Sequence, residues 1–327
     1  MDNRNYKFDN FRCILIFFTV FTHCVDAFCK NYTGADSIRY VYYWIYSFHM
    51  PAFVFISGYF SHLENPKYFY NSISRFLVPY LLINTAEQLL TSNQIDPSTS
   101  MWALWYLFSM FWWRALLPYA KKVRFSFFVF LIAALLAGKI DKIGYAFSLS
   151  RTICFFPYFL AGYLVRSKKQ KWVFTIRKSI ILPLFVVSSM CVIFLVYKNC
   201  SLEIFTMRNS YSAVGLTFIT GLALRLLTYV LGFTAILAFL SVLPDNKCRI
   251  STIGRYTYPV YILHAVILLA VKRSGILIEP VIALFLSLFV SACMCFLFGN
   301  IYVNKAVNWV FDAVSRVFLR ERQADSF

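Results

Sequence analysis

Charge is scarce in this chain of 327 residues, and its scarcity excludes whole classes of protein. Asp, Glu, Lys and Arg together make up 14% of the sequence, against about 25% in an ordinary soluble domain. Hydrophobic residues make up 60% and aromatic residues 20%. One soluble core cannot bury so much apolar surface, and an intrinsically disordered chain has the opposite composition. The composition therefore predicts a protein whose solvent is a lipid bilayer.

Motifs for metal, phosphate-loop and redox chemistry are also lacking. The nine cysteines include no CxxC pair and no Cys/His metal spacing, and no glycine-rich phosphate loop is present. Most cysteines lie in apolar runs as small hydrophobic residues, and Cys29 and Cys200, near expected outer loops, are one candidate disulfide. The sequence has no repeat, linker or cleaved signal peptide. We expect one membrane domain over residues 1–327, with no metal site and no bound cofactor.

What the sequence has instead is a series of ten apolar runs. Each is long enough, or nearly so, to cross about 30 Å of hydrocarbon as a helix, although the fifth is short. The pattern predicts an all-α polytopic membrane protein with about ten transmembrane helices. The runs lie near residues 11–29, 41–61, 74–92, 102–119, 124–138, 148–165, 179–197, 222–243, 256–272 and 278–301.

The basic residues predict how these runs are oriented. The net charge is +18, and the cations gather in short loops, which favours contact with anionic lipid or phosphate groups over nucleic acid. With ten crossings, 20 of the 32 Lys and Arg residues fall in inner segments and 8 in outer ones; the other four are Arg12, Arg114, Arg151 and Arg225, within or at the ends of runs. This bias predicts that both termini are cytoplasmic.

The first run carries polar residues that are costly in hydrocarbon and therefore indicate a function. Arg12 and His23 are eleven residues apart, which places them on one helix face about 16 Å apart in height. Asp26 follows His23 by three and shares that face. This stripe predicts a cation near the inner surface, a deep imidazole and a carboxylate that orients it. The alternative is a histidine that serves only the core.

Further polar residues follow in later runs. In the second run His49 is followed by Pro51, which bends or starts a helix, and by Ser57 and Gly58, which permit close helix packing. This His49 is either a buried structural histidine or a second imidazole that meets the first. At the start of the third run, Arg75 can pair with phosphate or simply extend to the lipid headgroups.

The remaining candidates are residues that can bind a polar substrate. Glu87, beside Asn84 on one face of the third run, either binds substrate or holds helices together. Trp105 belongs to a cluster of tryptophans that forms either an interfacial belt or a platform for a sugar ring. Arg151, near the outer surface, is a candidate substrate cation, whereas His264 in the ninth run is compatible with a structural role.

Five motifs in order make the sequence resemble the acyltransferase-3 family of integral-membrane acyltransferases, over essentially the whole chain. Its branch of fucose 4-O-acetylases and capsule or exopolysaccharide O-acetyltransferases is the most similar. The motifs are Asp9, Arg12 and His23; Phe48 to Gly58; Arg75, Pro79 and Tyr80; Trp105, Tyr106 and Leu107; and Gly254, Thr257, Tyr258, Tyr261 and His264.

The chain also departs from the family pattern. One extra residue separates Gly254 from Thr257, and Ser72 stands where many members carry the first Arg of Arg-x-x-Arg, so that Lys67 is expected to supply that cation. Longer members carry a fused extracytoplasmic domain, and we expect none here, because few residues follow the tenth run.

The resemblance implies a multi-pass protein of the bacterial inner (plasma) membrane that moves an acyl group, usually acetyl, from cytoplasmic acyl-CoA to a hydroxyl of a cell-surface polysaccharide or lipid-linked sugar. Arg12 and Arg75 then bind the anionic donor, because guanidinium groups pair well with phosphate. His23 is the general base, with Asp26 as its orienter. His49 is a second base, a proton relay or a ligand for the acyl carbonyl. Direct transfer and a transient acyl-histidine both remain open.

Other functions compete with this interpretation. A transporter or flippase of lipid-linked sugars is the main alternative, although such proteins often show internal repeats and broken helices. A glycan polymerase normally has a large outer loop, and a non-catalytic sensor would use the histidines as pH switches.

Overall fold

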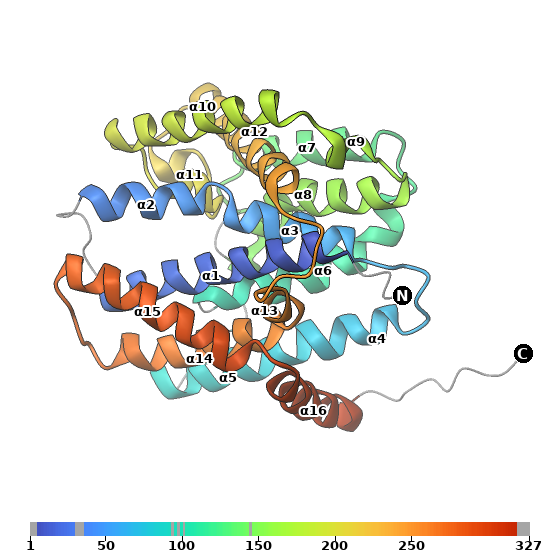
Figure 1. The fold of residues 1–327 in the computed structure, drawn as a ribbon, viewed down its shortest axis with the longest axis vertical. Coiled ribbons are helices and arrows are strands. Elements are labelled where there is room, and N and C mark those ends of the chain that lie inside the picture. Colours follow the sequence, from blue (N-terminus) through green and yellow to red (C-terminus); the bar gives the residue numbers. More distant parts are fainter. Residues whose placement is uncertain are drawn as a thin grey trace, which may run out of the picture.

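A computed structural model describes residues 5–29, 36–92, 95–96, 99–100, 102–143 and 146–318, and within them the chain is all-helical with no strand. Most of the long helices lie side by side across the view in Figure 1, whereas α12 crosses it obliquely. The helices are α1 (Tyr6–Phe28), α2 (Asp36–Tyr46), α3 (His49–Tyr59), α4 (Tyr68–Ser72), η2 (Ile73–Leu77), α5 (Val78–Ser92), η3 (Trp102–Leu104), α6 (Trp105–Ala120), α7 (Ser126–Ala137), η4 (Ala146–Ser148), α8 (Leu149–Ser167), α9 (Trp172–Thr175), α10 (Lys178–Tyr197), α11 (Glu203–Thr206), η5 (Ser212–Val214), α12 (Phe218–Val242), α13 (Ser251–Arg255), α14 (Thr257–Arg273), α15 (Pro280–Phe298) and α16 (Ile301–Phe318).

Every predicted apolar run coincides with helix, and the membrane character of the protein is visible in its surface. Among the described residues, α1, α10, α12 and α15 are by themselves long and apolar enough to cross a membrane. Large apolar side chains such as Met190 on α10 and Phe285 and Phe289 on α15 are exposed, as is expected of a surface solvated by lipid. Ten crossings and cytoplasmic termini remain predictions, and Arg4, Lys30, Arg320 and Arg322, which count toward the orientation, lie outside the described residues.

Two of the predicted runs are interrupted, and prolines account for the local geometry. The second run breaks between α2 and α3, with Pro51 in the first turn of α3. The third run contains the π-helical turn η2, which carries Arg75. Pro79 has no N–H to donate to the carbonyl of Arg75 four residues earlier. The Tyr258 hydroxyl of α14 donates to that carbonyl instead, at 3.0 Å.

A tyrosine hydroxyl also replaces a missing backbone donor at α6. Pro118 lies inside this helix and leaves the carbonyl of Arg114 without its helical donor. The Tyr68 hydroxyl of α4 donates to that carbonyl at 3.1 Å. Tyrosines from neighbouring helices thus satisfy both carbonyls, and they fix α4 to α6 and α14 to η2.

Close packing of α3 on α8 forms the centre of the bundle, as the Ser57–Gly58 pair predicts. A Cβ on Gly58 would lie 1.8 Å from the carbonyl oxygen of Phe159, and a Cβ on Gly162 would lie 1.9 Å from that of Phe55. The two backbones therefore touch where each helix has a glycine. His49 and Met50 lie at the start of the same helix, α3.

A larger side chain at this contact is expected to disrupt the fold. Gly162→Val should destabilise the protein by about 3 kcal/mol, because the new methyl groups must displace a backbone carbonyl. Thermal unfolding of the detergent-solubilised protein, followed by size-exclusion chromatography, measures the effect. Ala133→Val, on an exposed position of α7, is the matched control and should be nearly neutral. Equal midpoints for the two variants would contradict the packing argument.

The structure adds two findings about the chain. All nine cysteines are free, so the candidate disulfide between Cys29 and Cys200 is not formed. The chain also continues after the tenth run as a further long helix, α16, at the edge of the bundle (Figure 1). The periodicity of α16 is amphipathic rather than uniformly apolar, so a search for apolar runs does not find it.

Candidate active site

Two cavities lie in the bundle, one beyond the other along α1. The histidine cavity, about 250 Å³, is lined by residues that include His23, His49, Trp105, Arg151 and Lys272. The arginine cavity, about 470 Å³, is lined by residues that include Arg12, Arg75, Arg255, Tyr258 and Asn308. Arg12 and His23 therefore face the two cavities from one helix, as their spacing predicts.

The two cavities meet at four shared residues: Thr19, Met50, Tyr106 and Tyr261. We refer to this set as the junction. These residues come from α1, α3, α6 and α14. Hydrogen bonds hold its tyrosines, since the Tyr106 hydroxyl pairs with Ser57 at 2.7 Å and the Tyr261 hydroxyl donates to the Ala103 carbonyl. A molecule in either cavity can therefore reach the junction.

His23 is held by a second histidine through a chain of hydrogen bonds. His264 Nδ1 lies 3.0 Å from the Val260 carbonyl, which can only accept, so Nδ1 carries the proton of the neutral ring. His264 Nε2 is then the acceptor for His23 Nδ1 at 3.0 Å. The proton of neutral His23 consequently sits on Nδ1, and its Nε2 is left unprotonated as the basic atom.

Asp26, the candidate orienter of His23, pairs with a lysine in the structure. The Asp26 carboxylate accepts from Lys272 Nζ at 2.7 Å, and the Nδ1 position of His23 is occupied by His264. Spacing along α1 places Asp26 near His23, but Lys272 from the end of α14 pairs with the carboxylate. Asp26 and Lys272 both remain in the wall of the histidine cavity.

His49 shares this cavity with His23, so the two imidazoles do meet in one space. Its Nδ1 donates to the Ile45 carbonyl at 2.8 Å, and its ring packs edge-on against Tyr46. Neutral His49 therefore presents an unprotonated Nε2, which accepts hydrogen bonds but cannot donate them. This tautomer favours a second base or a proton relay over a ligand for an acyl carbonyl.

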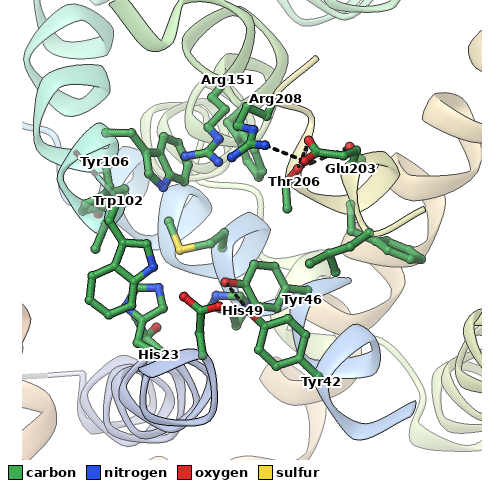
Figure 2. Close-up of a pocket in the computed structure, with 18 of the residues that line it drawn as sticks. His23, Tyr42, Tyr46, His49, Trp102, Tyr106, Arg151, Glu203, Thr206 and Arg208 are labelled. Atoms are coloured by element: carbon green, nitrogen blue, oxygen red, sulfur yellow. Dashed lines mark hydrogen bonds and ion pairs between the residues drawn. The ribbon is translucent and has the colours of Figure 1, made fainter. Parts of the chain in front are cut away.

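Aromatic and charged side chains surround the histidines. Figure 2 shows His23 and Trp102, Tyr42 and Tyr46, and Arg151 and Arg208 directed toward one central space. The Trp102 ring lies 4.6 Å from the His23 ring, between centroids. Trp105 lies beneath the Arg151 guanidinium at 4.8 Å. Trp105 and Arg151, both predicted to bind substrate, thus lie together in this cavity.

Glu87, the third residue predicted to bind substrate, lies elsewhere. It is buried on α5 and lines neither the histidine nor the arginine cavity. The backbone carbonyl of Glu87 accepts a hydrogen bond from the Arg273 guanidinium at 2.9 Å. The neighbouring Gln88 amide donates to the carbonyls of Asp96 and Thr99, so this polar face of α5 anchors the segment that follows the helix. The two roles predicted for Glu87, binding substrate or holding helices together, therefore stay predictions, and its position lies outside both cavities.

Cations line the arginine cavity, and a further cation outside it lies beside the position of the missing family arginine. Arg12 stacks on Phe60 at 4.1 Å, and Arg75 and Arg255 line the same cavity. Lys67 is exposed and lines neither cavity. Arg114 of α6 instead reaches Ser72 and donates to its hydroxyl at 2.7 Å. A cation from another helix therefore stands beside the position where many family members carry arginine.

Sequence reasoning missed several residues that line the histidine cavity. Glu203 and Arg208, joined by an ion pair of 2.8 Å, come from α11 and the segment after it, and nothing in the sequence marks them as part of the cavity. The sequence alone is compatible with a structural role for His264, although this residue ends one of the five motifs. That motif was the available signal, because it joins Tyr261 at the junction to the partner of His23.

Comparison with known proteins gives one match. A family model described as "Acyltransferase domain", that of the acyltransferase-3 family, matches residues 5–300. No curated protein and no solved structure matches the chain. The matched region includes both cavities except for the contributions of α16 to the arginine cavity.

Proposed function

Because the chain belongs to the acyltransferase-3 family of membrane acyltransferases, we propose that it transfers an acetyl group from cytoplasmic acetyl-CoA to a hydroxyl of a cell-surface polysaccharide or lipid-linked sugar. We further propose that it works in a bacterial plasma membrane, which it crosses ten times with both termini in the cytoplasm. The contiguity of an arginine cavity and a histidine cavity at the junction is the observation that carries the proposal.

The charges of the two cavities match the two substrates. Acyl-CoA carries several phosphate charges, and Arg12, Arg75 and Arg255 offer guanidinium groups for them. A sugar is neutral and presents hydroxyls and an apolar ring face, which suit the aromatic and hydrogen-bonding groups around Trp105 and Tyr46. The donor therefore occupies the arginine cavity, the acceptor occupies the histidine cavity, and the thioester lies at the junction.

His23 Nε2 supplies the base for the reaction. A sugar hydroxyl is a poor nucleophile at neutral pH and must lose its proton as it attacks. The proton passes to His23 Nε2 while the hydroxyl oxygen bonds to the thioester carbonyl carbon. The carbon–sulfur bond then breaks, and the leaving thiolate takes the proton from His23 to give free CoA. If an acyl-histidine forms first, Nε2 is the attacking atom, so both routes use the same tautomer.

The direction of the helices supports the proposed orientation. Gly254, just before α14, packs against the backbone of Asp9 near the start of α1, and Lys272 near the end of α14 pairs with Asp26 near the end of α1. The two helices are therefore parallel, as the first and ninth of ten alternating crossings must be. The arginine cavity then opens on the side where basic loops gather, which is the cytoplasmic side by the positive-inside rule.

Replacing Arg12 tests the donor site. Arg12→Gln should raise the KM for acetyl-CoA by about tenfold or more, because a charge-assisted contact to phosphate is lost. Arg12→Lys keeps the charge but loses the planar guanidinium group, so its KM for acetyl-CoA should lie between those of the wild type and Arg12→Gln. Membranes containing the protein are supplied with labelled acetyl-CoA, and alkali-labile label in glycan is counted. An unchanged KM in both variants would contradict this assignment.

Mass spectrometry of the surface polysaccharide with and without the gene identifies the sugar.

A transporter or flippase of lipid-linked sugars is the second candidate, and the row of two adjoining cavities along α1 is the observation that favours it. Transport requires substrate movement across the membrane without acetyl-CoA. Proteoliposomes containing the protein and a labelled lipid-linked sugar distinguish the two functions. Flux without donor and without ester formation would replace the acyltransfer proposal.

A further inference from the structure

Helix α16 builds a groove that the family match does not include. The match ends at residue 300, and α16 spans Ile301–Phe318. The start of the helix is capped, because the Asn300 side chain accepts from the backbone N–H groups of Tyr302 and Val303, both at 3.0 Å. Phe311 is buried in the same apolar cluster as Tyr261. The polar residues of α16 are therefore held in a defined place.

The groove beside α16 continues the arginine cavity. It measures about 300 Å³ and shares Arg75, Asn304 and Asn308 with that cavity. Its further lining includes Lys305, Trp309 and Arg316, which follow one another at helical spacing along α16. The histidine cavity, the arginine cavity and this α16 groove thus form a row, joined first by the junction and then by Arg75 and the two asparagines.

We propose that the α16 groove binds the adenosine 3′,5′-bisphosphate end of the acyl-CoA donor. This inference rests on the proposed function, which places the thioester at the junction and the donor in the arginine cavity. A long donor with its reactive end at the junction extends past Arg75, and the α16 groove is the continuation of that path.

The chemistry of the groove fits a nucleotide. Arg75, Lys305 and Arg316 outnumber the single acid, Asp312, and offer charge-assisted contacts to the phosphates. Trp309 exposes 71% of its surface and lines the groove. An indole offers a stacking surface for adenine, an interaction that binds bases without sequence preference. Cations and an aromatic ring together form a site for a phosphorylated base rather than for a phosphate ion alone.

A second groove touches Arg75 but is less suited to the nucleotide. It measures about 200 Å³ and includes His62 and Arg114. The Arg114 guanidinium already donates to the Ser72 hydroxyl and to the Tyr68 carbonyl, and it stacks on the Tyr68 ring at 3.9 Å. No exposed aromatic platform comparable to Trp309 lines this groove among the described residues.

Donors with and without the nucleotide test the inference. Lys305→Gln combined with Arg316→Gln should raise the KM for acetyl-CoA about tenfold, while the KM for S-acetylpantetheine, which lacks the nucleotide, stays unchanged. Trp309→Ala should act in the same way, and Trp309→Phe should restore most of the affinity. Lys168→Gln combined with Lys169→Gln removes two exposed cations from another loop and is the matched control.

Direct binding separates this inference from the proposed function. Adenosine 3′,5′-bisphosphate should bind the purified wild-type protein, and the Lys305/Arg316 double variant should bind it about tenfold more weakly while the lysine control binds normally. Equal binding by wild type and double variant, or equal KM changes for both donors, would overturn the α16 site. Normal bisphosphate binding by a wild-type protein that transfers no acetyl group would overturn the acyltransfer proposal and leave a nucleotide site at α16.

Discussion

His23→Ala should lower acetyl transfer from acetyl-CoA to glycan by at least about a thousandfold, because a positioned base contributes about 10² to 10⁴ to such a reaction and the acyl-histidine route also loses its nucleophile. His23 lines the histidine cavity next to the junction, and its hydrogen bond to His264 leaves Nε2 as the basic atom. The substituted side chain carries no group that can take the hydroxyl proton. Labelled acetyl-CoA and isolated membranes give the rate.

Two controls accompany this experiment. His62→Ala removes a histidine that lines neither of the two central cavities and should leave the rate nearly unchanged. Binding of CoA to His23→Ala should also stay normal, because the cations proposed to bind its phosphates do not line the histidine cavity. Glycan acetylation that persists in His23→Ala would refute the catalytic assignment. Label that stays on denatured wild-type protein in the absence of acceptor would indicate an acyl-histidine.

His264→Leu should lower kcat by about 10² or more without raising the KM for acetyl-CoA. His264 is fully buried, and its Nε2 accepts from His23 Nδ1. Without that acceptor the His23 proton is free to move to Nε2, which blocks the base, and the ring can rotate. His264 is thus a positioning residue that acts through His23.

A conservative variant separates this role from a loss of folding. His264→Gln keeps an oxygen near the position of Nε2 that can accept from His23 Nδ1, so it should recover a large part of kcat. Both variants are compared for their thermal midpoints and for their KM and kcat values. Equal loss of kcat in the leucine and glutamine variants would contradict the hydrogen-bond role, as would a change confined to KM.

Helix periodicity in the sequence predicts much of the fold and part of the candidate site. The Arg12–His23 spacing predicts one face on one helix, and the two residues do face contiguous cavities from α1. Partners on other helices were beyond this reasoning. Asp26 has the right spacing to orient His23, but α14 brings His264 to His23 and Lys272 to Asp26. Spacing along one helix contains no information about which side chain a parallel neighbour contributes.

The tyrosines that replace the missing proline donors show the same limit. Pro79 and Pro118 are visible in the sequence as helix breakers, but the donors that replace their missing N–H groups, Tyr258 and Tyr68, are 179 and 50 residues away. Helix α16 is not predicted from the sequence for a different reason. It has one polar and one apolar face, which suits the edge of a membrane protein, whereas a continuous apolar run is the pattern that predicts a membrane-spanning helix.

We propose that the acyl donor and the base meet at the junction of the two cavities. A structure of the protein in lipid nanodiscs with S-acetonyl-CoA, a ketone analogue that cannot release its acyl group, tests this proposal. We expect the ketone among Thr19, Met50, Tyr106 and Tyr261, on the side facing His23, with the phosphates toward Arg12 and Arg75. A ketone bound outside the junction, or phosphates in the histidine cavity, would contradict it.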